Sequence, residues 1–375
     1  MLRSCRLLWI SVVGLTGNGR GVFKMRALVT GGIGFIGTNL SSRLLHDGQE
    51  VILFDNVSRA GVRQNLDWLR SQHHSRLQFI EGDVRDFGAL ERAMRGVDTV
   101  FHLAAQVAVT TSVANPQYDF SVNAQGTLNV LEVARNLNPM PVVLYTSTNK
   151  VYGGLEHVGV VEQSSRYEFE RLPHGVPETF PLDFHSPYGC SKGTSDQYVR
   201  DYYRIYGLPS VVLRMSCIYG PHQFGNEDQG WVAHFALTSL RGGRLTIYGN
   251  GKQVRDLLYV NDLVDLILLA RARIDRTAGQ VYNVGGGATN TISIWAELCG
   301  PLRDLVGNLP PVDYGGFRPG DQRIYVSDMR KVKEHLNWTP RVSIMEGLRN
   351  MIEAWEEDGT ISHRSMAARS QAGRI

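Results

Sequence analysis

Two short stretches of the sequence carry hydroxyl and amine side chains at spacings that suit proton transfer. In SPYGCSKG, Tyr188 and Lys192 are four residues apart, so on a helix both side chains lie on one face. Ser186 suits the cap of that helix and Pro187 its first turn. A phenol has a pKa of about 10, and bringing it near neutrality takes roughly three units, about 4 kcal/mol, from neighbouring positive charge. Lys192 can supply part of that charge, which would make Tyr188 a base toward a substrate hydroxyl.

The second stretch is STNKVYG, at 147–153, and it follows the apolar run PVVLYT. The stretch therefore lies at the carboxyl end of a buried strand, which is where the functional residues of parallel sheets are found. Several of its members could act, among them Thr148, Lys150 and Tyr152, and spacing alone does not choose between them. An ordinary half-exposed helix face also remains an alternative for Tyr188 and Lys192 when that pair is taken alone.

A glycine-rich turn, LVTGGIGFIG, supplies the context that decides against this alternative. Gly31 permits a tight turn, Gly34 lets the backbone approach a pyrophosphate, and Gly37 allows the following helix to pack on the strand. The next apolar strand ends in Asp55, about twenty residues on, where a carboxylate would accept from ribose hydroxyls. That carboxylate would repel a 2′-phosphate, which favours NAD over NADP, although Arg59 keeps NADP possible. Tyr188 would then take a proton while hydride leaves the same substrate carbon for the nicotinamide.

The pattern from residue 26 onward alternates short apolar strands with helices, which predicts a doubly wound α/β fold with a parallel sheet. The strands are RALVT, VILF, LQFIEGD, DTVFHLA, PVVLYTS and PSVVLRM, and the helices are expected near 35–47, 65–71, 86–95, 116–136 and 187–206. Residues 154–186 are irregular and predict a functional loop. We expect a dinucleotide-binding domain over 25–215 and a substrate-binding lobe over 216–358, from which some segments return to the first domain.

The composition is that of a globular protein without a nucleic-acid or membrane partner. The 375 residues are 43% hydrophobic and 20% charged, with 39 basic and 36 acidic side chains, no basic patch and no run long enough to span a bilayer. The cysteines at 5, 190, 217 and 299 have no metal-binding spacing, so we expect no metal, no disulfides and a cytoplasmic location. Residues 1–24 suit a signal or transit peptide weakly; we favour an extension or an upstream start. Residues 359–375 are expected to be a disordered tail.

These motifs together resemble the extended short-chain dehydrogenases/reductases, specifically the NAD-dependent epimerase/dehydratase family, from Met25 to about residue 358. The resemblance implies that Thr148, beside Ser147, hydrogen-bonds the reacting hydroxyl, and that Tyr152 is structural. In this family the sugar 4,6-dehydratases carry an Asp-Glu pair after that threonine. Asn149 and Lys150 stand there instead, so the resemblance disfavours dehydration and favours an epimerase.

Longer stretches are similar to the CDP-paratose 2-epimerases, notably FHLAAQVAVTTSVANP, FGNEDQGWVAHF and GNGKQVRDLLYVNDL. The UDP-galactose 4-epimerases typically have a lysine after HLAGL, whereas this chain reads Ala105-Gln106-Val107. The resemblance implies that Arg255 binds the diphosphate and that Arg318 and Asp321 bind phosphate and ribose. Guanidinium groups suit this role because they pair bidentately with phosphate oxygens. The choice of cytosine rests on the resemblance alone.

The expected site residues fall into two sets, besides the catalytic Thr148, Tyr188 and Lys192. The cofactor-binding set is Gly31, Ile33, Gly34, Phe35, Ile36, Gly37, Asp55, Asn56, Ser58, Arg59, Asp83, Val84, Leu103, Ala104, Ala105, Asn123, Thr146, Ser147, Tyr188 and Lys192. The substrate-binding set is Gln106, Thr110, Thr111, Thr148, Asn149, His185, Arg255, Arg318 and Asp321. For His185 and His222 a plain loop histidine is an equal alternative.

The sequence therefore predicts an NAD-dependent nucleotide-sugar epimerase, acting on a CDP-linked sugar through a transient 2-keto intermediate. The resemblance further implies a homodimer or homotetramer. A UDP-hexose 4-epimerase, or another nucleotide-sugar epimerase or reductase, is the alternative within enzymes. A dinucleotide-binding protein without catalysis is the alternative from another class, against which intact Thr148, Tyr188 and Lys192 argue.

Overall fold

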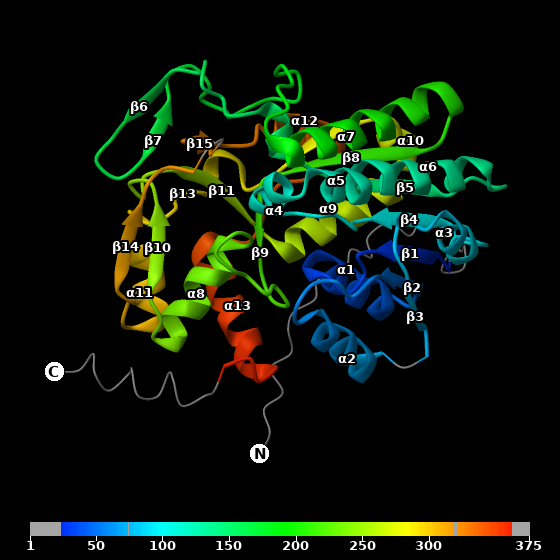
Figure 1. The fold of residues 1–375 in the computed structure, drawn as a ribbon, viewed down its shortest axis with the longest axis horizontal. Helices are drawn as coiled ribbons and strands as arrows, with labels where there is room; N and C mark the ends of the chain where they lie inside the picture. Colours follow the sequence, from blue (N-terminus) through cyan, green and yellow to red (C-terminus); the bar gives the residue numbers. More distant parts are fainter. Residues whose placement is uncertain (1–23, 74, 319–320, 362–375) are drawn as a thin grey trace.

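The computed structural model describes residues 24–73, 75–318 and 321–361, and a large parallel sheet occupies its centre (Figure 1). All but the last residue of the expected extension, and all but three residues of the expected tail, lie outside the described residues. Within the described ranges, no helix is both long and apolar enough to cross a bilayer.

The central sheet has seven strands, and all its pairs are parallel. In spatial order the strands are β12 (Val281–Val284), β8 (Ser210–Met215), β5 (Val142–Thr148), β4 (Thr99–His102), β1 (Arg26–Thr30), β2 (Glu50–Asp55) and β3 (Leu77–Glu81). Every residue of β5 is buried, because helices cover both faces of the sheet. This is the doubly wound α/β fold that the sequence predicted.

Each face of the sheet has its own hydrophobic core. In β1, Ala27 and Val29 pack into one core, while Leu28 points into the other, as the two-residue period of a strand requires. The helices of the first face are α1 (Phe35–His46), α2 (Val62–Gln72), α9 (Val260–Ala272) and α12 (Arg330–Leu336). Those of the second face are α3 (Phe87–Ala93), α6 (Gly126–Asn136) and α7 (Ser186–Tyr206).

The helix expected over 116–136 is present without a break, but it is not α-helical throughout. It consists of α5 (Pro116–Phe120), a π-helical segment (Ser121–Gln125) and α6, and the short α4 (Val109–Ala114) precedes it. Single π-helical turns widen a helix locally and are frequent at functional sites. Here the turn contains Asn123, whose amide donates to Ser191 Oγ on α7 at 3.0 Å.

A smaller lobe follows β8 and has a core of its own around Phe235, Leu348 and Trp355. Its strands are β9 (Cys217–Tyr219), β10 (Leu245–Tyr248), β11 (Val254–Tyr259), β13 (Thr291–Ser293), β14 (Val312–Gly315) and β15 (Ile324–Tyr325). Its helices are α8 (Trp231–Arg241), α11 (Cys299–Val306) and α13 (Ile344–Glu357). Figure 1 shows β10, β14, α8 and α11 together on the side away from β3.

Three later segments return to the large unit instead of staying in the lobe. Helices α9 and α12 pack on the first face of the sheet, and β12 forms its edge beside β8. The short α10 (Ile274–Thr277) follows α9. The loop expected over 154–186 is less irregular than its composition indicates, since β6 (Val160–Glu162) and β7 (Tyr167–Phe169) pair in it as an antiparallel hairpin.

Candidate active site

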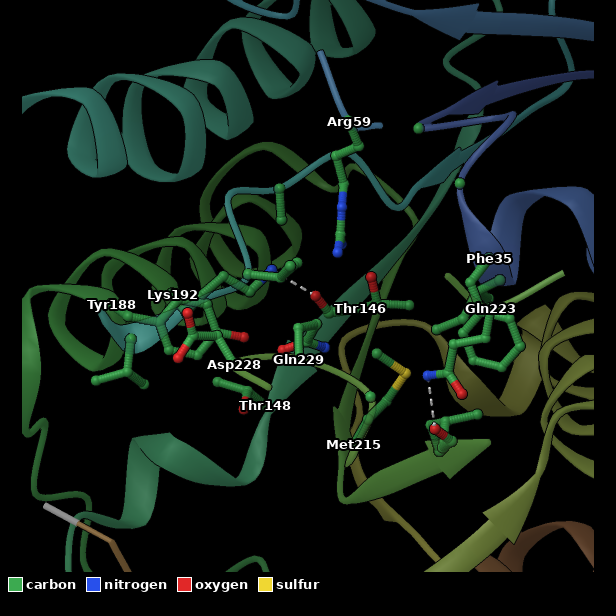
Figure 2. A pocket seen from close by; sticks show the side chains of 18 of the residues that line it. Phe35, Arg59, Thr146, Thr148, Tyr188, Lys192, Met215, Gln223, Asp228 and Gln229 are labelled. Carbon is green, nitrogen blue, oxygen red and sulfur yellow. Dashed lines mark hydrogen bonds between the residues drawn. The ribbon is translucent and has the colours of Figure 1, made fainter. Parts of the chain in front are cut away.

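One cavity of about 820 Å³ lies where the carboxyl ends of the parallel strands face the smaller lobe. It runs from the glycine turn after β1, past the ends of β2, β4 and β5, to Arg255 of β11. Ligands of open α/β sheets bind at this edge, because the loops that follow each strand converge there. In Figure 2, Tyr188, Lys192 and Thr148 lie on one side of the cavity and Phe35 on the other.

The glycine turn brings backbone close to the cavity. Gly31 has φ +67°, and a Cβ placed on it would lie 2.9 Å from the backbone nitrogen of Ala104. A Cβ on Gly37 would lie 2.2 Å from the Gly31 carbonyl oxygen, so only glycine lets α1 approach this turn. Helix α1 starts after Gly34 without a side-chain cap and has no acidic residue in its first turn. Its amino end is therefore free to receive a pyrophosphate.

Asp55, at the end of β2, lies in the same cavity as Arg59. Its carboxylate accepts from the Val57 backbone N–H at 2.9 Å and, more weakly, from the Ile33 N–H at 3.4 Å. Burial raises the pKa of Asp55, while these two bonds and the charge of Arg59 lower it. A partly buried carboxylate that faces the cavity is suited to accept hydrogen bonds from the two hydroxyls of a ribose.

The lining also includes a polar atom that lacks a protein partner. The Oε1 atom of Gln223 is buried and has no hydrogen-bond partner in the described part of the chain. A buried acceptor of this kind costs free energy unless a ligand or water satisfies it. Together with the uncapped helix and Asp55, it fits a dinucleotide.

Tyr188 and Thr148 meet at the end of β5. Burial raises the pKa of the Tyr188 phenol to about 12, and the nearby charge of Asp119 adds to this, while a hydrogen bond with Thr148 lowers it. The protein alone therefore keeps the phenol protonated, and Lys192, expected to supply part of the positive charge, does not bring the pKa of Tyr188 near neutrality. A positively charged nicotinamide ring is the remaining source of the necessary charge.

Lys192 lies one helical turn after Tyr188. Its ammonium donates to the Thr146 backbone oxygen at 2.7 Å and lies 4.3 Å from the centre of the Tyr145 ring. Burial lowers the pKa of Lys192 to about 7, although Asp196 and Asp119 act in the opposite direction. The amine is thus held in one place and titrates near neutral pH.

The start of α7 fixes the direction of Tyr188. The Ser186 hydroxyl accepts from the Gly189 N–H at 3.2 Å, as a capping serine does, although the cap position itself is His185, one residue before the cap expected from the sequence. Ser186 has φ +68°, an uncommon conformation for a residue other than glycine. The Tyr188 N–H donates to Ser112 Oγ at 3.1 Å, so α4 also holds this end of the helix.

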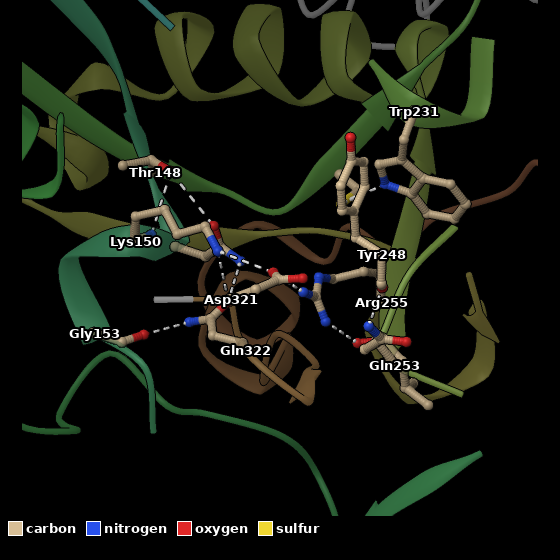
Figure 3. A network of polar contacts seen from close by, with 12 residues as sticks. Thr148, Lys150, Gly153, Trp231, Tyr248, Gln253, Arg255, Asp321 and Gln322 are labelled. Carbon is tan, nitrogen blue, oxygen red and sulfur yellow. Dashed lines mark hydrogen bonds and ion pairs between the residues drawn. The ribbon is translucent and has the colours of Figure 1, made fainter. Parts of the chain in front are cut away.

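The end of the cavity away from the glycine turn, at Arg255, is rich in charged side chains. Arg255 Nη2 donates to Asp321 Oδ1 at 2.7 Å, and Lys150 Nζ lies 3.9 Å from the same oxygen (Figure 3). Arg318 Nη1 lies 3.3 Å from Asp228 Oδ1, and its guanidinium lies 3.8 Å from the centre of the Tyr248 ring. Guanidinium groups that are paired with carboxylates in a cavity lining can exchange them for phosphate oxygens.

Several lining residues were not predicted as contacts. Glu227 and Asp228 come from the loop before α8, Trp231 from its first turn, and Tyr248 from the end of β10. The stretch containing Asp228 and Trp231 was singled out as a family motif. Its position in the cavity depends on the packing of the lobe, which no local pattern reveals.

Most of the predicted site residues line the cavity, and six do not: Ile33, Asp83, Gln106, Thr111, Asn123 and His185. The Gln106 side-chain amide forms hydrogen bonds within its own loop: Nε2 donates to the Ala108 backbone oxygen, and Oε1 accepts from the Ala108 backbone N–H. Asn123 Oδ1 accepts from the Gln106 N–H at 2.9 Å. These two residues therefore support the loop after β4 instead of facing the cavity.

Comparison with known proteins gives a consistent picture. The family model described as GDP-mannose 4,6 dehydratase matches residues 28–351. The CDP-paratose 2-epimerase of Salmonella typhi is 43% identical over 342 residues, which cover 88% of this chain and 98% of that protein.

Two solved structures show the same fold at higher than 30% identity. A UDP-glucose 4-epimerase from Thermotoga maritima, solved with UDP-glucose, has a TM-score of 0.75 and 34% identity over 89% of this chain and 99% of its own. A dTDP-glucose 4,6-dehydratase from Streptomyces venezuelae, solved with NAD, has a TM-score of 0.76 and 33% identity over 91% of this chain and 100% of its own.

Proposed function

Because the chain belongs to the NAD-dependent epimerase/dehydratase family of short-chain dehydrogenases/reductases, we propose that it inverts carbon 2 of CDP-paratose to form CDP-tyvelose. Its cofactor is NAD and its substrates are nucleotide sugars. The identity to the Salmonella typhi enzyme, which extends over nearly the whole length of that protein, supports the choice of this sugar.

The observation that carries the epimerase assignment is the chemistry of the two residues after Thr148. Asn149 Nδ2 and Lys150 Nζ both donate to Gln322 Oε1, at 3.3 and 3.4 Å. Elimination of water from a sugar needs a general acid and a general base beside the neighbouring carbons. An amide and an ammonium at these positions do not provide such a pair, whereas an epimerase does not require one.

The roles of the catalytic residues follow from their positions. Thr148 hydrogen-bonds the reacting hydroxyl, and Tyr188 takes the proton from that hydroxyl and later returns it. The hydrogen bond to the Thr146 oxygen fixes the Lys192 ammonium beside Tyr188 and Thr148. The glycine turn, the amino end of α1 and Asp55 would hold NAD, which would supply a reversible hydride acceptor for carbon 2, so that inversion would involve no net redox change.

The substrate is expected to lie with its diphosphate toward the charged end of the cavity. Arg255 and Arg318 are the proposed diphosphate ligands, and Asp321 the proposed ribose ligand. Thr110 and Asn149 line the cavity nearer the reaction centre and remain our candidates for contacts with the sugar.

Proton NMR of CDP-paratose with the purified protein in deuterated water tests this function, with UDP-galactose as a parallel sample. We expect inversion at carbon 2 without incorporation of deuterium, because the hydride returns directly. Conversion of UDP-galactose alone would replace the proposal by a UDP-hexose 4-epimerase. Conversion of neither sugar would reject both assignments.

We propose further that the enzyme works in the cytoplasm as a homodimer or homotetramer. The exposed side chains of Tyr198, Tyr203, Ile205 and Tyr206 lie along α7 and support an interface there. Light scattering of the purified protein measures the oligomeric state, and a monomeric mass would contradict this part of the proposal.

A further inference from the structure

Lys150 is a largely buried cation for which the proposed reaction has no use. Only 23% of its side chain is exposed, and its ammonium lies 3.4 Å from Gln322 Oε1 and 3.9 Å from Asp321 Oδ1 (Figure 3). Gln322 is fixed in turn, because its Nε2 donates to the Gly153 oxygen at 2.7 Å. The lysine amine is therefore held at one point of the cavity lining.

Two cations converge at that point on one anionic oxygen. Arg255 Nη2 lies 2.7 Å from Asp321 Oδ1, the same atom that Lys150 approaches. These three side chains carry one positive charge in excess, in a place with little access to water. Burial lowers the pKa of Lys150, and the charge of Arg255 lowers it further, while Asp321 raises it. An additional anion at this place would relieve the imbalance.

Lys150 is close in the sequence to Thr148, so an anion bound by Lys150 would lie near the carbon that reacts beside Thr148. Lys150 is two residues after Thr148, and its backbone N–H donates to Thr148 Oγ1 at 3.3 Å. The amine therefore belongs to the same short segment as the group that would hold the reacting hydroxyl. A substrate whose reacting carbon is close to its phosphate would bring that phosphate to Lys150.

A pyranose linked to a diphosphate meets this condition at carbon 2 and not at carbon 4. Carbon 2 is bonded directly to carbon 1, which carries the diphosphate, whereas carbon 4 lies across the ring. We infer that Lys150, together with Arg255, binds the sugar-linked phosphate of the substrate and so holds carbon 2 against Thr148 and Tyr188. This inference rests on the proposed function, which it deepens by assigning a residue that selects the carbon to be inverted.

Binding of CDP and CMP to the NAD-loaded protein, measured by calorimetry, tests this contact, since CMP lacks the second phosphate. In Lys150→Met we expect the affinity for CDP to fall roughly tenfold to hundredfold, as for a lost charge-assisted hydrogen bond, with the affinity for CMP unchanged. Lys150→Arg should recover part of the loss. Lys333→Met, at an exposed position on α12, is the matched control and should bind both nucleotides as the unchanged protein does.

An unchanged ratio of CDP to CMP affinity in Lys150→Met would overturn the inference, because it would show that Lys150 serves only Asp321 and Gln322. UDP and UMP are measured in parallel. If the unchanged protein prefers uridine nucleotides, the CDP assignment fails, and the same ratio for UDP and UMP still decides whether Lys150 binds phosphate.

Turnover tests the positioning of carbon 2 separately. We expect kcat/KM for inversion of CDP-paratose at carbon 2 to fall in Lys150→Met by at least the factor lost in CDP affinity. Unchanged kcat/KM together with weakened CDP binding would refute the selection of carbon 2.

Discussion

Arg214 and Asp196 form a two-bond ion pair beneath the active site, with Nε to Oδ2 and Nη2 to Oδ1 both at 2.9 Å. The two side chains are 3% and 0% exposed. Asp196 Oδ2 also accepts from Ser147 Oγ at 2.8 Å, and Arg214 Nη1 donates to the Tyr152 phenol at 3.0 Å. The pair thus joins β8, α7 and the segment that carries Thr148.

Loss of one partner of this pair should be strongly destabilising. We expect Arg214→Met to lower the free energy of unfolding by about 3–5 kcal/mol, because it leaves the Asp196 carboxylate buried and unpaired. Urea unfolding followed by circular dichroism measures the change. The control is Arg244→Met, whose pair with Asp313 is exposed at 62% and 55% and should contribute less than about 1 kcal/mol. Equal effects of the two substitutions would contradict the structural role of the buried pair.

Removal of the Tyr188 hydroxyl should separate cofactor binding from catalysis. We expect Tyr188→Phe to retain NAD and to lose turnover by roughly 10²–10⁴-fold, since the ring remains and only the proton acceptor is lost. NMR of the sugar and the absorbance of the bound cofactor give the two readouts. Tyr314→Phe, at an exposed position on β14 outside the cavity lining, should be fully active. Near-normal turnover of Tyr188→Phe would exclude this residue as the base.

The cofactor preference should depend on the charge of Asp55. We expect Asp55→Asn to reduce the ratio of NAD to NADP affinity by roughly tenfold to hundredfold, because the repulsion of a 2′-phosphate and a charged acceptor for the ribose are both removed. Fluorescence titration with both reduced cofactors measures the ratio. Asp67→Asn, at an exposed position on α2, should leave it unchanged. An unaltered ratio of NAD to NADP affinity in Asp55→Asn would show that another group determines the preference at the ribose 2′ position.

Acid should destabilise the protein in part through His102, which lies at the end of β4. Burial lowers the pKa of His102 to about 3, and the imidazole nitrogens lie 2.7 Å from Thr30 Oγ1 and 3.0 Å from Thr127 Oγ1. Because the folded-state pKa is below the unfolded value of about 6.5, the unfolded chain binds the proton more readily between pH 6.5 and 3. The contribution of neutral His102 is complete above pH 6.5 and is lost as the pH falls.

The measurement is urea unfolding at several pH values between 6 and 4. We expect the stability of the unchanged protein to fall by about 1.4 kcal/mol per pH unit more than that of His102→Gln. The difference between the two slopes isolates His102 from other buried groups, such as His222, whose pKa burial lowers to about 4. Parallel slopes would refute the assignment.

The sequence alone was sufficient where the decisive contacts are local. The glycine turn and the end of β2 each depend on one strand and one turn, so their spacing pointed to a dinucleotide site, and that context in turn singled out the Tyr188-Lys192 pair on one helix face. The apolar runs likewise indicated a parallel sheet, which the structure has. The π-helical turn at Ser121–Gln125 could not be predicted, because its amino acids fit an ordinary helix and its stabilising contact is with Ser191 on α7.

The place of Lys150 at the charged end of the cavity was decided only by tertiary structure. Lys150, Arg255 and Asp321 come from the segment after β5, from β11 and from the segment before β15. The family resemblance implied phosphate and ribose contacts for Arg255 and Asp321, but nothing in the sequence placed Lys150 beside them. Their approach depends on how the smaller lobe packs on the sheet, because side-chain distances between remote segments follow from the whole core. The sequence by itself therefore determined the fold, the enzyme family and its cofactor, because these depend on local motifs, whereas folding brought together the groups that we propose select the carbon of the sugar.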